Sequence, residues 1–478
     1  MSKDKINDIK IAYIGGGSRG WAWKLMADLA LEKELAGTVK LYDIDYESAK
    51  NNEIIGNKIS GKPEVPGKWK YTAVKTLDEA LYGADLVVIS ILPGTFNEMY
   101  SDVHTPEKYG IYQSVGDTTG PGGLIRGLRT VPMYVEFAEG IKRNCPDAWV
   151  INYTNPMAIC LKTLYEVFPR IKAFGCCHEV FGTQELLVDV VKHYLGEDIE
   201  ISRRDIKVNV LGINHFTWFD KASYKSIDIF PLYKEFIDKF YEEGYERERG
   251  RWERDYFASA NRVKFDLFRR FGLIGAAGDR HLAEFIPYIY LTDRETVRRW
   301  KFSLTPVEWR IKNRERLDAL GKEFASGQRD IPLIQSGEEG VMQMKAIFGL
   351  DTFVTNVNLP NRGQIPNLPV GSIVETNAVF TRDDVCPVYA GELPPDLASI
   401  MIRHISNQEL IVRSVLERDL NLARRAFLND PAVERLSTDK ANQLFKEMID
   451  NTKMYLQDTL YMSLACSARA EIVQAKFL

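Results

Sequence analysis

The sequence predicts an α/β protein in which a doubly wound parallel sheet precedes a mostly helical α+β part. Short apolar runs alternate with helical patterns in the first part, and the first run leads directly into a glycine-rich turn. Strands that alternate with helices pair in parallel with right-handed crossovers, and ligands collect at the carboxyl ends of such strands. The pattern changes near residue 200, so we divide the chain into residues 1–200 and 201–478.

The elements of the first part follow one another regularly. The runs expected to form strands are Ile9 to Ile14, Thr38 to Tyr42, Ala84 to Leu92, Ala148 to Thr154 and Lys172 to Cys177. Helical patterns stand between them, for example Val131 to Asn144 and Met157 to Val167. In the second part we expect antiparallel strands in Asp205 to Tyr224, a long charged helix over Lys234 to Asp255, and an extended segment over Thr352 to Val379.

Composition indicates a globular protein with a large hydrophobic core. The 478 residues are 45% hydrophobic and 27% charged, with a formal net charge of -4. A weakly acidic chain does not favour nucleic acid or an anionic membrane as its principal partner. The N-terminus is polar and no apolar run reaches the roughly 20 residues of a membrane helix, so we expect a cytoplasmic location. Four scattered cysteines show no disulfide framework and are expected to be reduced: Cys145, Cys160, Cys386 and Cys466.

The turn after the first strand has the form G-x-G-x-x-G and predicts a Rossmann-type dinucleotide site. The residues expected to contact the cofactor are Gly15, Gly17, Ser18, Gly20 and Asp43. Glycines allow the tight turn and the approach of a pyrophosphate to a helix N-terminus. Asp43 ends the next strand, where a carboxylate can bind a ribose diol, which favours NAD over NADP. Arg19 leaves open an interaction with a 2′-phosphate.

The stretch "GCCHEVFGTQ" places Cys176, Cys177 and His178 at the end of a predicted strand, and His215 follows near another strand end. Thiolate and imidazole suit a transition metal ion. Successive residues of an extended chain point to opposite faces, so Cys177 and Cys176 should point apart, leaving His178 for proton transfer. By spacing alone, cysteines that fill a core and a buried structural histidine are the better explanation of this cluster.

Several longer motifs resemble glycoside hydrolase family 4. They are "VGDTTGPGGLIRGLRTVP", "NYTNPMAIC", "FGCCHEV", "GINHF" and "TNVNLPNRGQIPNLP", and they are spread over nearly the whole chain. The resemblance implies an NAD-dependent, usually manganese-dependent glycosidase, outside the usual two-carboxylate mechanism. The "CHEV" stretch, with "AAGDRHLAEF" and "GINHFTWF", is most similar to the α-galacturonidase branch. The family resemblance also implies an architecture like that of lactate and malate dehydrogenases, and a homodimer or homotetramer.

The resemblance implies roles for individual residues. Cys177 and His215 would bind the metal ion, Asn155 would hydrogen-bond the sugar hydroxyls, and His178 would be the acid toward the leaving oxygen. The base that removes the C2 proton would come from "GDRHLAEF", which offers Asp279, His281 and Glu284; His281 is nearest to the family's tyrosine position, and Glu284 is expected to contact the substrate. The candidates for binding a uronate carboxylate are Arg126, Arg129, Arg280 and Arg362.

The implied reaction oxidises the sugar at C3 with NAD, which acidifies the C2 proton and allows elimination of the leaving group, addition of water and re-reduction. Alternatives are a family 4 enzyme for an α-galactoside or α-glucuronide, and a 2-hydroxyacid dehydrogenase, which shares the N-terminal architecture. A non-catalytic NAD sensor would need no metal ligands.

Overall fold

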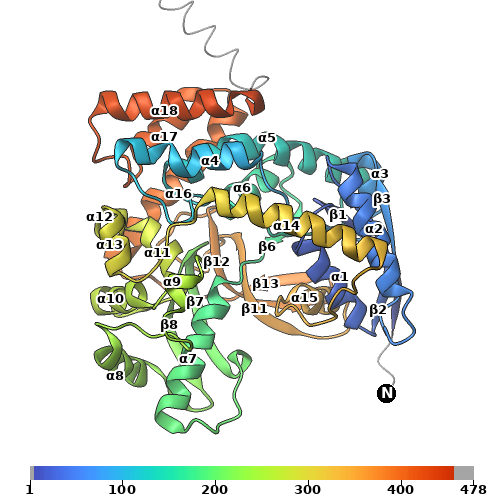
Figure 1. Cartoon of the computed structure of the whole chain (residues 1–478), viewed down its shortest axis with the longest axis horizontal. Coiled ribbons are helices and arrows are strands. Elements are labelled where there is room, and N and C mark those ends of the chain that lie inside the picture. The colour runs from blue at the N-terminus through green and yellow to red at the C-terminus, as the bar shows by residue number, and fades with distance from the viewer. Residues whose placement is uncertain (1–4, 457–478) are drawn as a thin grey trace, which may run out of the picture.

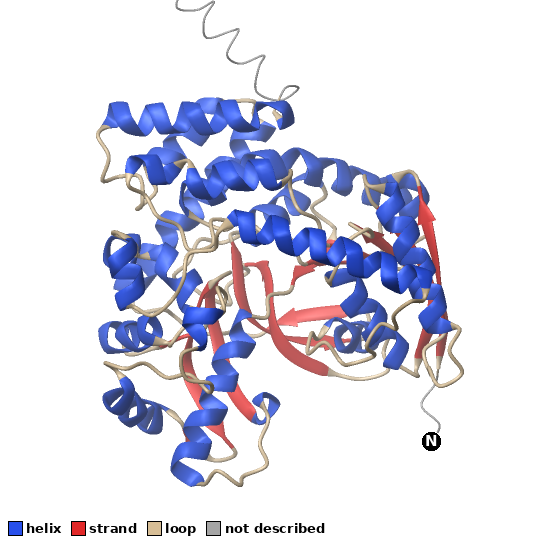
Figure 2. Ribbon diagram, in the orientation of Figure 1, coloured by secondary structure: helices blue, strands red, loops and turns tan. Residues whose placement is uncertain are grey.

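The computed structural model describes residues 5–456, and Cys466 lies outside them. Six parallel strands, in the order β6-β5-β4-β1-β2-β3, form the first part of a nine-stranded sheet. Their bounds are β1 Ile6–Ile14, β2 Leu35–Tyr42, β3 Trp69–Val74, β4 Leu86–Ile89, β5 Trp149–Asn152 and β6 Lys172–Gly175. This order is that of a Rossmann-type sheet, as the glycine turn predicts. Figure 2 shows most of the strands between helices, with one edge of the sheet at the right margin of the molecule.

The helices of the first part lie between these strands, except the last, which follows β6. They are α1 Trp21–Leu31, α2 Tyr46–Ser60, α3 Leu77–Leu81, α4 Phe96–His104, α5 Gly120–Asn144, α6 Met157–Val167 and α7 Glu179–Leu195. Helix α5 begins well before the predicted start at Val131, because Pro121 fits the first helical turn, where its missing N–H costs nothing. A Cβ on Gly127 would lie 2.5 Å from Ile159 of α6, so the glycine permits the close packing of these two helices.

Three strands from the second part extend the same sheet beyond β6. They are β11 Phe353–Pro360, β12 Ile373–Thr381 and β13 Asp384–Pro387, all antiparallel to their neighbours. The extended segment predicted over 352–379 is therefore present as the hairpin of β11 and β12. The two parts share one sheet, and the division at residue 200 stays a prediction.

A second, smaller sheet is antiparallel. It contains β7 Ile206–Ile213, β8 Phe216–Tyr224, β9 Ile227–Asp228 and β10 Ile274–Gly275. Around it lie α8 Phe230–Phe240, α9 Arg251–Arg254, α10 Arg262–Phe271, α11 Asp279–Phe285, α12 Pro287–Tyr290 and α13 Arg294–Arg299. The single charged helix expected over 234–255 is wrong: α8 and α9 are separate, and Gly244 and Gly250 adopt positive φ angles between them. Glycine takes this left-handed conformation at no steric cost.

The remaining helices come from the second part, and two groups of them lie over the first part (Figure 1). They are α14 Val307–Ser326, α15 Gly340–Ile347, α16 Pro395–Leu416, α17 Leu420–Leu428 and α18 Thr438–Thr452. Helix α14 packs against α2 and α4, and α16 packs against α5 and α6. Within residues 5–456 we find no helix long and apolar enough to cross a membrane.

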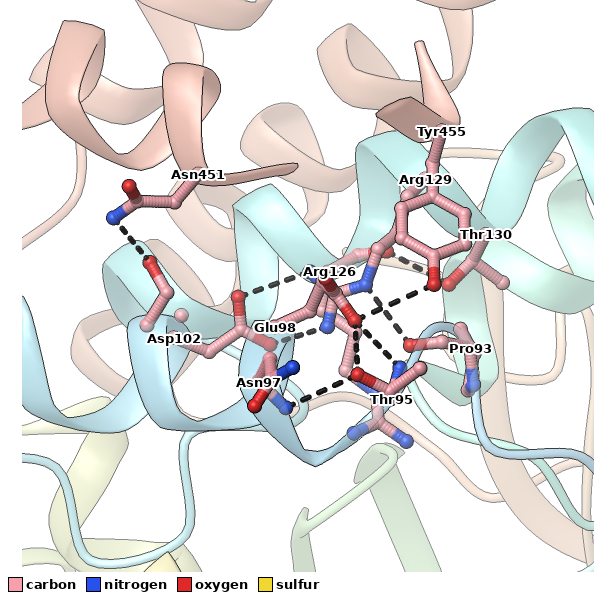
Figure 3. A network of polar contacts seen from close by, with 12 residues as sticks. Pro93, Thr95, Asn97, Glu98, Asp102, Arg126, Arg129, Thr130, Asn451 and Tyr455 are labelled. Carbon is pink, nitrogen blue, oxygen red and sulfur yellow. Dashed lines mark hydrogen bonds and ion pairs between the residues drawn. The ribbon is translucent and has the colours of Figure 1, made fainter. Parts of the chain in front are cut away.

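A buried ion pair joins α5 to α4 (Figure 3). The side chains of Arg129 and Asp102 are each 1% exposed, and Arg129 Nη1 donates to Asp102 Oδ1 at 2.9 Å. Arg129 Nε also donates to the carbonyl oxygen of Pro93 at 2.9 Å. From the C-terminal end, Asn451 donates to Ser101 of α4 at 2.9 Å. These contacts join α4 to α5 and to the helix that ends at Thr452.

The Asp102→Asn variant is expected to lose about 3 kcal/mol of unfolding free energy, because it leaves the Arg129 guanidinium buried without a counter-charge. Urea denaturation measures this loss. The matched control is Asp78→Asn, which removes an exposed ion pair with Arg143 and should cost less than about 1 kcal/mol. Equal losses in the two variants would show that the buried pair contributes no more to the free energy of unfolding than the exposed pair does.

Candidate active site

One large cleft of about 1350 Å³ lies at the carboxyl ends of the parallel strands. Its wall includes the glycine turn after β1, the end of β2, and the segments after β4, β5 and β6. Residues of α11 and α14 from the second part complete it. This is where a doubly wound sheet binds its ligands. Most of the predicted site residues border this cleft.

The glycine turn is shaped by close backbone contacts. The amides of Gly15 and Gly16 both donate to the carbonyl oxygen of Tyr42 at 2.9 Å. A Cβ on Gly15 would lie 2.0 Å from the carbonyl oxygen of Ser90, so no other residue fits there. Gly20 is the N-cap of α1 with φ 129° and no side-chain cap, which leaves the first-turn amides open to an anion.

The carboxylate of Asp43 closes the turn. It accepts hydrogen bonds from the amides of Gly17 and Asp45, both at 2.9 Å, and burial raises its pKa. Arg19 is paired with two other carboxylates, Asp45 at 3.2 Å and Asp318 at 2.6 Å. With its charge compensated in this way, Arg19 is a poor partner for a 2′-phosphate, and the turn favours NAD.

At the other end of the cleft, three side chains form a compact group of possible metal ligands. Ligand atoms of Asp117, His215 and His281 all lie within 4.8 Å of one another. The two imidazole rings are 3.7 Å apart, centroid to centroid. Burial lowers the pKa of His215 to about 3 and also lowers that of His281, so both rings are neutral at physiological pH and can bind a metal.

Hydrogen bonds select the tautomer of His215. The hydroxyl of Thr118 donates to Asp117 Oδ1 at 2.8 Å and lies 2.7 Å from His215 Nδ1. Since the single hydroxyl proton is directed to Asp117, Nδ1 of His215 carries the proton and donates to Thr118. The lone pair on Nε2 is left for a metal ion, in the manner of a ligand oriented by its hydrogen-bond partner. His215 itself sits in the tight turn between β7 and β8 with φ 68°.

The two adjacent cysteines have different surroundings. Cys176 Sγ donates to Gln343 Oε1 at 3.2 Å and packs against the core, yet Cys176 also borders the cleft, so its separation from the ligand pocket stays a prediction. Cys177 borders the cleft but is not in the compact group of Asp117, His215 and His281. Burial raises the pKa of its thiol well above the usual value, with further contributions from Glu375 and Glu179. Its assignment as a metal ligand therefore stays a prediction.

A buried carboxylate behind Cys177 links the loops of both predicted ligands. Glu375 of β12 accepts from Asn356 at 2.7 Å and from Asn214, the neighbour of His215, at 3.3 Å. Asn356 also donates to the carbonyl oxygen of Cys177 at 3.4 Å. Burial raises the pKa of Glu375 to about 7. The spacing of the motifs gave no signal for this link, because Glu375 lies in a strand far along the chain.

The other predicted catalytic residues differ in their accessibility. His178 is the N-cap residue of α7, and its ring is stacked on Trp21 in the cleft. His281 borders the cleft with Nε2 at 3.5 Å from Glu179, and its buried Nδ1 has no hydrogen-bond partner among residues 5–456. Asp279 accepts from the amides of Val263 at 3.2 Å and Lys264 at 3.1 Å, so its carboxylate caps α10.

Two residues predicted to contact the substrate lie in different surroundings. Asn155 borders the cleft after β5, and its buried Oδ1 has no partner among the described residues. Glu284 accepts from the amides of Val115 at 2.7 Å and Gly116 at 2.8 Å. It thus supports the loop that carries Asp117 and is absent from the cleft wall. Burial raises the pKa of Glu284 to about 8.

The four arginines proposed to bind a uronate carboxylate lie in different places. Arg126 and Arg280 border the cleft, whereas Arg362 borders a smaller pocket elsewhere. Arg129 is paired with Asp102. The structure adds Arg310 of α14, which no sequence motif indicated. Asp117 and Glu179 were also missed, although both stand inside motifs quoted above.

Residues 10–193 match the model of family 4 glycosyl hydrolases, and residues 210–433 match that of the family's C-terminal domain. An α-galacturonidase of Thermoanaerobacter italicus is 61% identical over 455 residues, which cover 95% of this chain and 98% of the relative. The α-galacturonidase of Bacillus subtilis is 54% identical over 445 residues, 93% of this chain and 97% of the relative. The chain therefore belongs to the family 4 glycosyl hydrolases, and the predicted resemblance is confirmed.

Solved structures agree with this assignment. The crystal structure of lplD from Bacillus subtilis, described as a glucosidase, is 52% identical with a TM-score of 0.89, and the match covers 93% of this chain and 100% of that chain. A 6-phospho-α-glucosidase from gut microorganisms, in complex with NAD and Mn²⁺, shares the fold at 20% identity and a TM-score of 0.76, over 95% and 99% of the two chains. The predicted fold class is confirmed.

The Glu284→Gln variant tests the support of the Asp117 loop. Because the pKa of Glu284 is raised in the folded protein, the unfolded chain loses this proton at a lower pH than the folded protein does. The free energy of unfolding of the wild type should therefore fall as pH rises from about 4.5 to about 8. Glutamine keeps an acceptor for the amides of Val115 and Gly116 and has no proton to lose. In metal-free protein, E284Q should gain stability over the wild type between pH 5 and pH 8, on the order of a few kcal/mol.

Urea denaturation at both pH values measures this gain. Glu308→Gln, at an exposed position of α14, is the control and should shift both values equally. A constant difference between E284Q and the wild type across this range would contradict the prediction.

Proposed function

We propose that this chain is an NAD- and manganese-dependent α-galacturonidase. The observation that carries the proposal is one cleft that joins the glycine turn to Asn155 and the His215 group. The sugar class is supported by the relatives: α-galacturonidases are 61% and 54% identical, whereas the α-galactosidase of Bacillus subtilis is 27% identical. The proposed substrate is an oligosaccharide that contains an α-linked galacturonide. We also infer a homodimer or homotetramer on the family resemblance alone, and we keep the cytoplasmic location expected from the sequence.

The residues present fit both groups that the proposal requires. The turn at Gly15 and the uncapped N-terminus of α1 suit a pyrophosphate, and Asp43 suits a ribose. At the metal end, Asn155 Oδ1 and His281 Nδ1 are buried polar atoms without partners among residues 5–456, which indicates that a ligand completes the site. We assign the metal to His215 Nε2, Asp117 and the predicted ligand Cys177.

When bound, NAD supplies a reversible hydride acceptor at C3 of the sugar, and the metal ion supplies Lewis acidity at the C2 and C3 hydroxyls. The chain's own residues position the sugar and move its protons. Asn155 orients a hydroxyl through its unpaired Oδ1. His178, in the cleft and half-exposed, donates a proton to the leaving glycosidic oxygen.

The structure supports His281 as the base for the C2 proton. Burial lowers its pKa, which keeps the ring neutral and able to accept a proton. Glu179, 3.5 Å from Nε2, favours the proton on that nitrogen and leaves the lone pair on Nδ1 free. Asp279, the alternative, has its carboxylate engaged in capping α10. We therefore propose His281 rather than Asp279 in this role.

Incubation of the protein with Mn²⁺, NAD and an aryl α-galacturonide should release the aryl group without net accumulation of NADH, because the hydride returns to the sugar. In D₂O the released sugar should carry deuterium at C2, since His281 exchanges the abstracted proton with solvent. Absorbance and mass spectrometry measure the two results. Turnover of an aryl α-galactoside or α-glucuronide in place of the galacturonide would refute the sugar assignment.

The Cys177→Ser and Asp117→Asn variants should each weaken Mn²⁺ binding by at least about tenfold, because each removes or weakens an anionic ligand. Calorimetric titration with Mn²⁺ in the presence of NAD measures the affinity independently of turnover. Cys176→Ser is the matched control and should bind Mn²⁺ like the wild type, since its thiol is bonded to Gln343. Unchanged affinity in Cys177→Ser would remove this residue from the metal site.

A further inference from the structure

Three arginines in the cleft have no carboxylate partner within the described part of the chain. Arg126 donates to the carbonyl oxygen of Asn155 at 3.0 Å, and Arg280 donates to the carbonyl oxygen of Ser303 at 3.0 Å. Arg310 makes no hydrogen bond or ion pair with any residue from 5 to 456, and its guanidinium lies over the ring of Phe257. The other arginines of the cleft wall, Arg19, Arg251 and Arg314, are each paired with an aspartate.

Unpaired cations in a partly enclosed cleft indicate that an anion belongs there. Burial is the main cause that lowers the pKa of Arg280, to about 10, and also that of Arg310. A buried charge is costly unless it is paired, and guanidinium groups match a carboxylate in fork geometry. Of the three, only Arg310 has no N–H donor engaged by any residue between 5 and 456, so all its donors are available to a ligand.

Arg280 and Arg310 lie on the same aromatic ring. Their Cζ atoms are 5.1 Å and 5.4 Å from the centroid of Phe257, which borders the cleft and is 48% exposed. Arg280 is held by Ser303, by the carbonyl oxygen of Ser114 and by the hydroxyl of Thr305. One guanidinium is thus fixed by the backbone, while its neighbour remains available to a ligand.

The position of Arg310 along α14 places it toward the sugar and away from the nucleotide. Arg310, Arg314 and Asp318 follow one another at intervals of four residues, so they lie on one face of the helix. Asp318 pairs with Arg19 beside the glycine turn at 2.6 Å. Arg310 is about 12 Å further along the helix, and Asp117 of the metal group acts on it electrostatically.

We propose that Arg310, supported by Arg280, binds the C6 carboxylate of the sugar and determines the preference for a galacturonide over a galactoside. This inference rests on the proposed α-galacturonidase function. The two sugars differ at C6, where a carboxylate replaces a neutral hydroxymethyl group. Arg126 contacts Asn155 at the metal end and is assigned no part in this selection.

The test compares the wild type with Arg310→Gln on an aryl α-galacturonide and on the matching aryl α-galactoside, with Mn²⁺ and NAD present. We expect kcat/KM for the galacturonide to fall on the order of 100-fold, mainly through KM, because the carboxylate loses its charged partner. The value for the galactoside should stay within about twofold or rise. Arg310→Lys should give an intermediate loss, because an ammonium keeps the charge without the fork.

Arg316→Gln is the control, since Arg316 is exposed on the same helix and its guanidinium donates to Asn313. Thermal shift with free D-galacturonate and with D-galactose, with Mn²⁺ and NAD present, adds a readout of binding. D-Galacturonate should stabilise the wild type and Arg316→Gln, and should lose this effect in Arg310→Gln.

Equal losses on both substrates, or an unchanged preference for the galacturonide, would overturn the role of Arg310. A wild type that releases no aryl group from the galacturonide but acts on another α-glycoside refutes the proposed function itself. The two failures are therefore distinguishable. Melting temperatures of the variants without ligand show whether each is folded. If Arg310→Gln does not fold, the kinetic comparison of Arg310→Lys with the wild type tests the proposal.

Discussion

The antiparallel pairing of β11 with β6 is the contact on which the arrangement of the cleft depends. Asn358 of β11 is opposite Gly175, the last residue of β6, two residues before Cys177. Through this pairing the β11–β12 hairpin continues the parallel sheet, and β12 in turn packs against β7. The turn after β7 carries His215. The second part of the chain is thereby set against the carboxyl ends of the strands that bind the cofactor.

Electrostatics at the metal end follow from this enclosure. Glu284 accepts from the amide of Gly116 beside Asp117, and Glu375 accepts from the side chains of Asn214, next to His215, and of Asn356, which donates to the carbonyl oxygen of Cys177. Both glutamates are buried, and neither lines the cleft. Burial keeps the imidazoles neutral and raises the pKa of both glutamates. A site that collects several acidic and basic groups in a low-dielectric space is poised for proton transfer, which fits the acid and base steps of the proposed reaction.

Much of the first part could be predicted because its signals are local. The strand from Ile9, the glycine turn and Asp43 lie close together in the sequence, and their geometry follows from backbone sterics and alternation. The opposite directions expected for Cys176 and Cys177 follow from the same alternation; Cys176 packs against the core, but it also borders the cleft beside Cys177. Strand β3 was missed, because its alternating pattern lies in a polar segment at the edge of the sheet.

The sequence by itself determined the Rossmann-type half, the family and the motif residues around Cys177 and His215. Only the tertiary structure decided which of these residues act together. Asp117 joins His215, Glu284 turns away to support a loop, and Arg310 reaches the cleft from α14. The physical reason is that such contacts join segments up to about two hundred residues apart, and their geometry depends on how β11 and α14 pack, which local spacing does not encode.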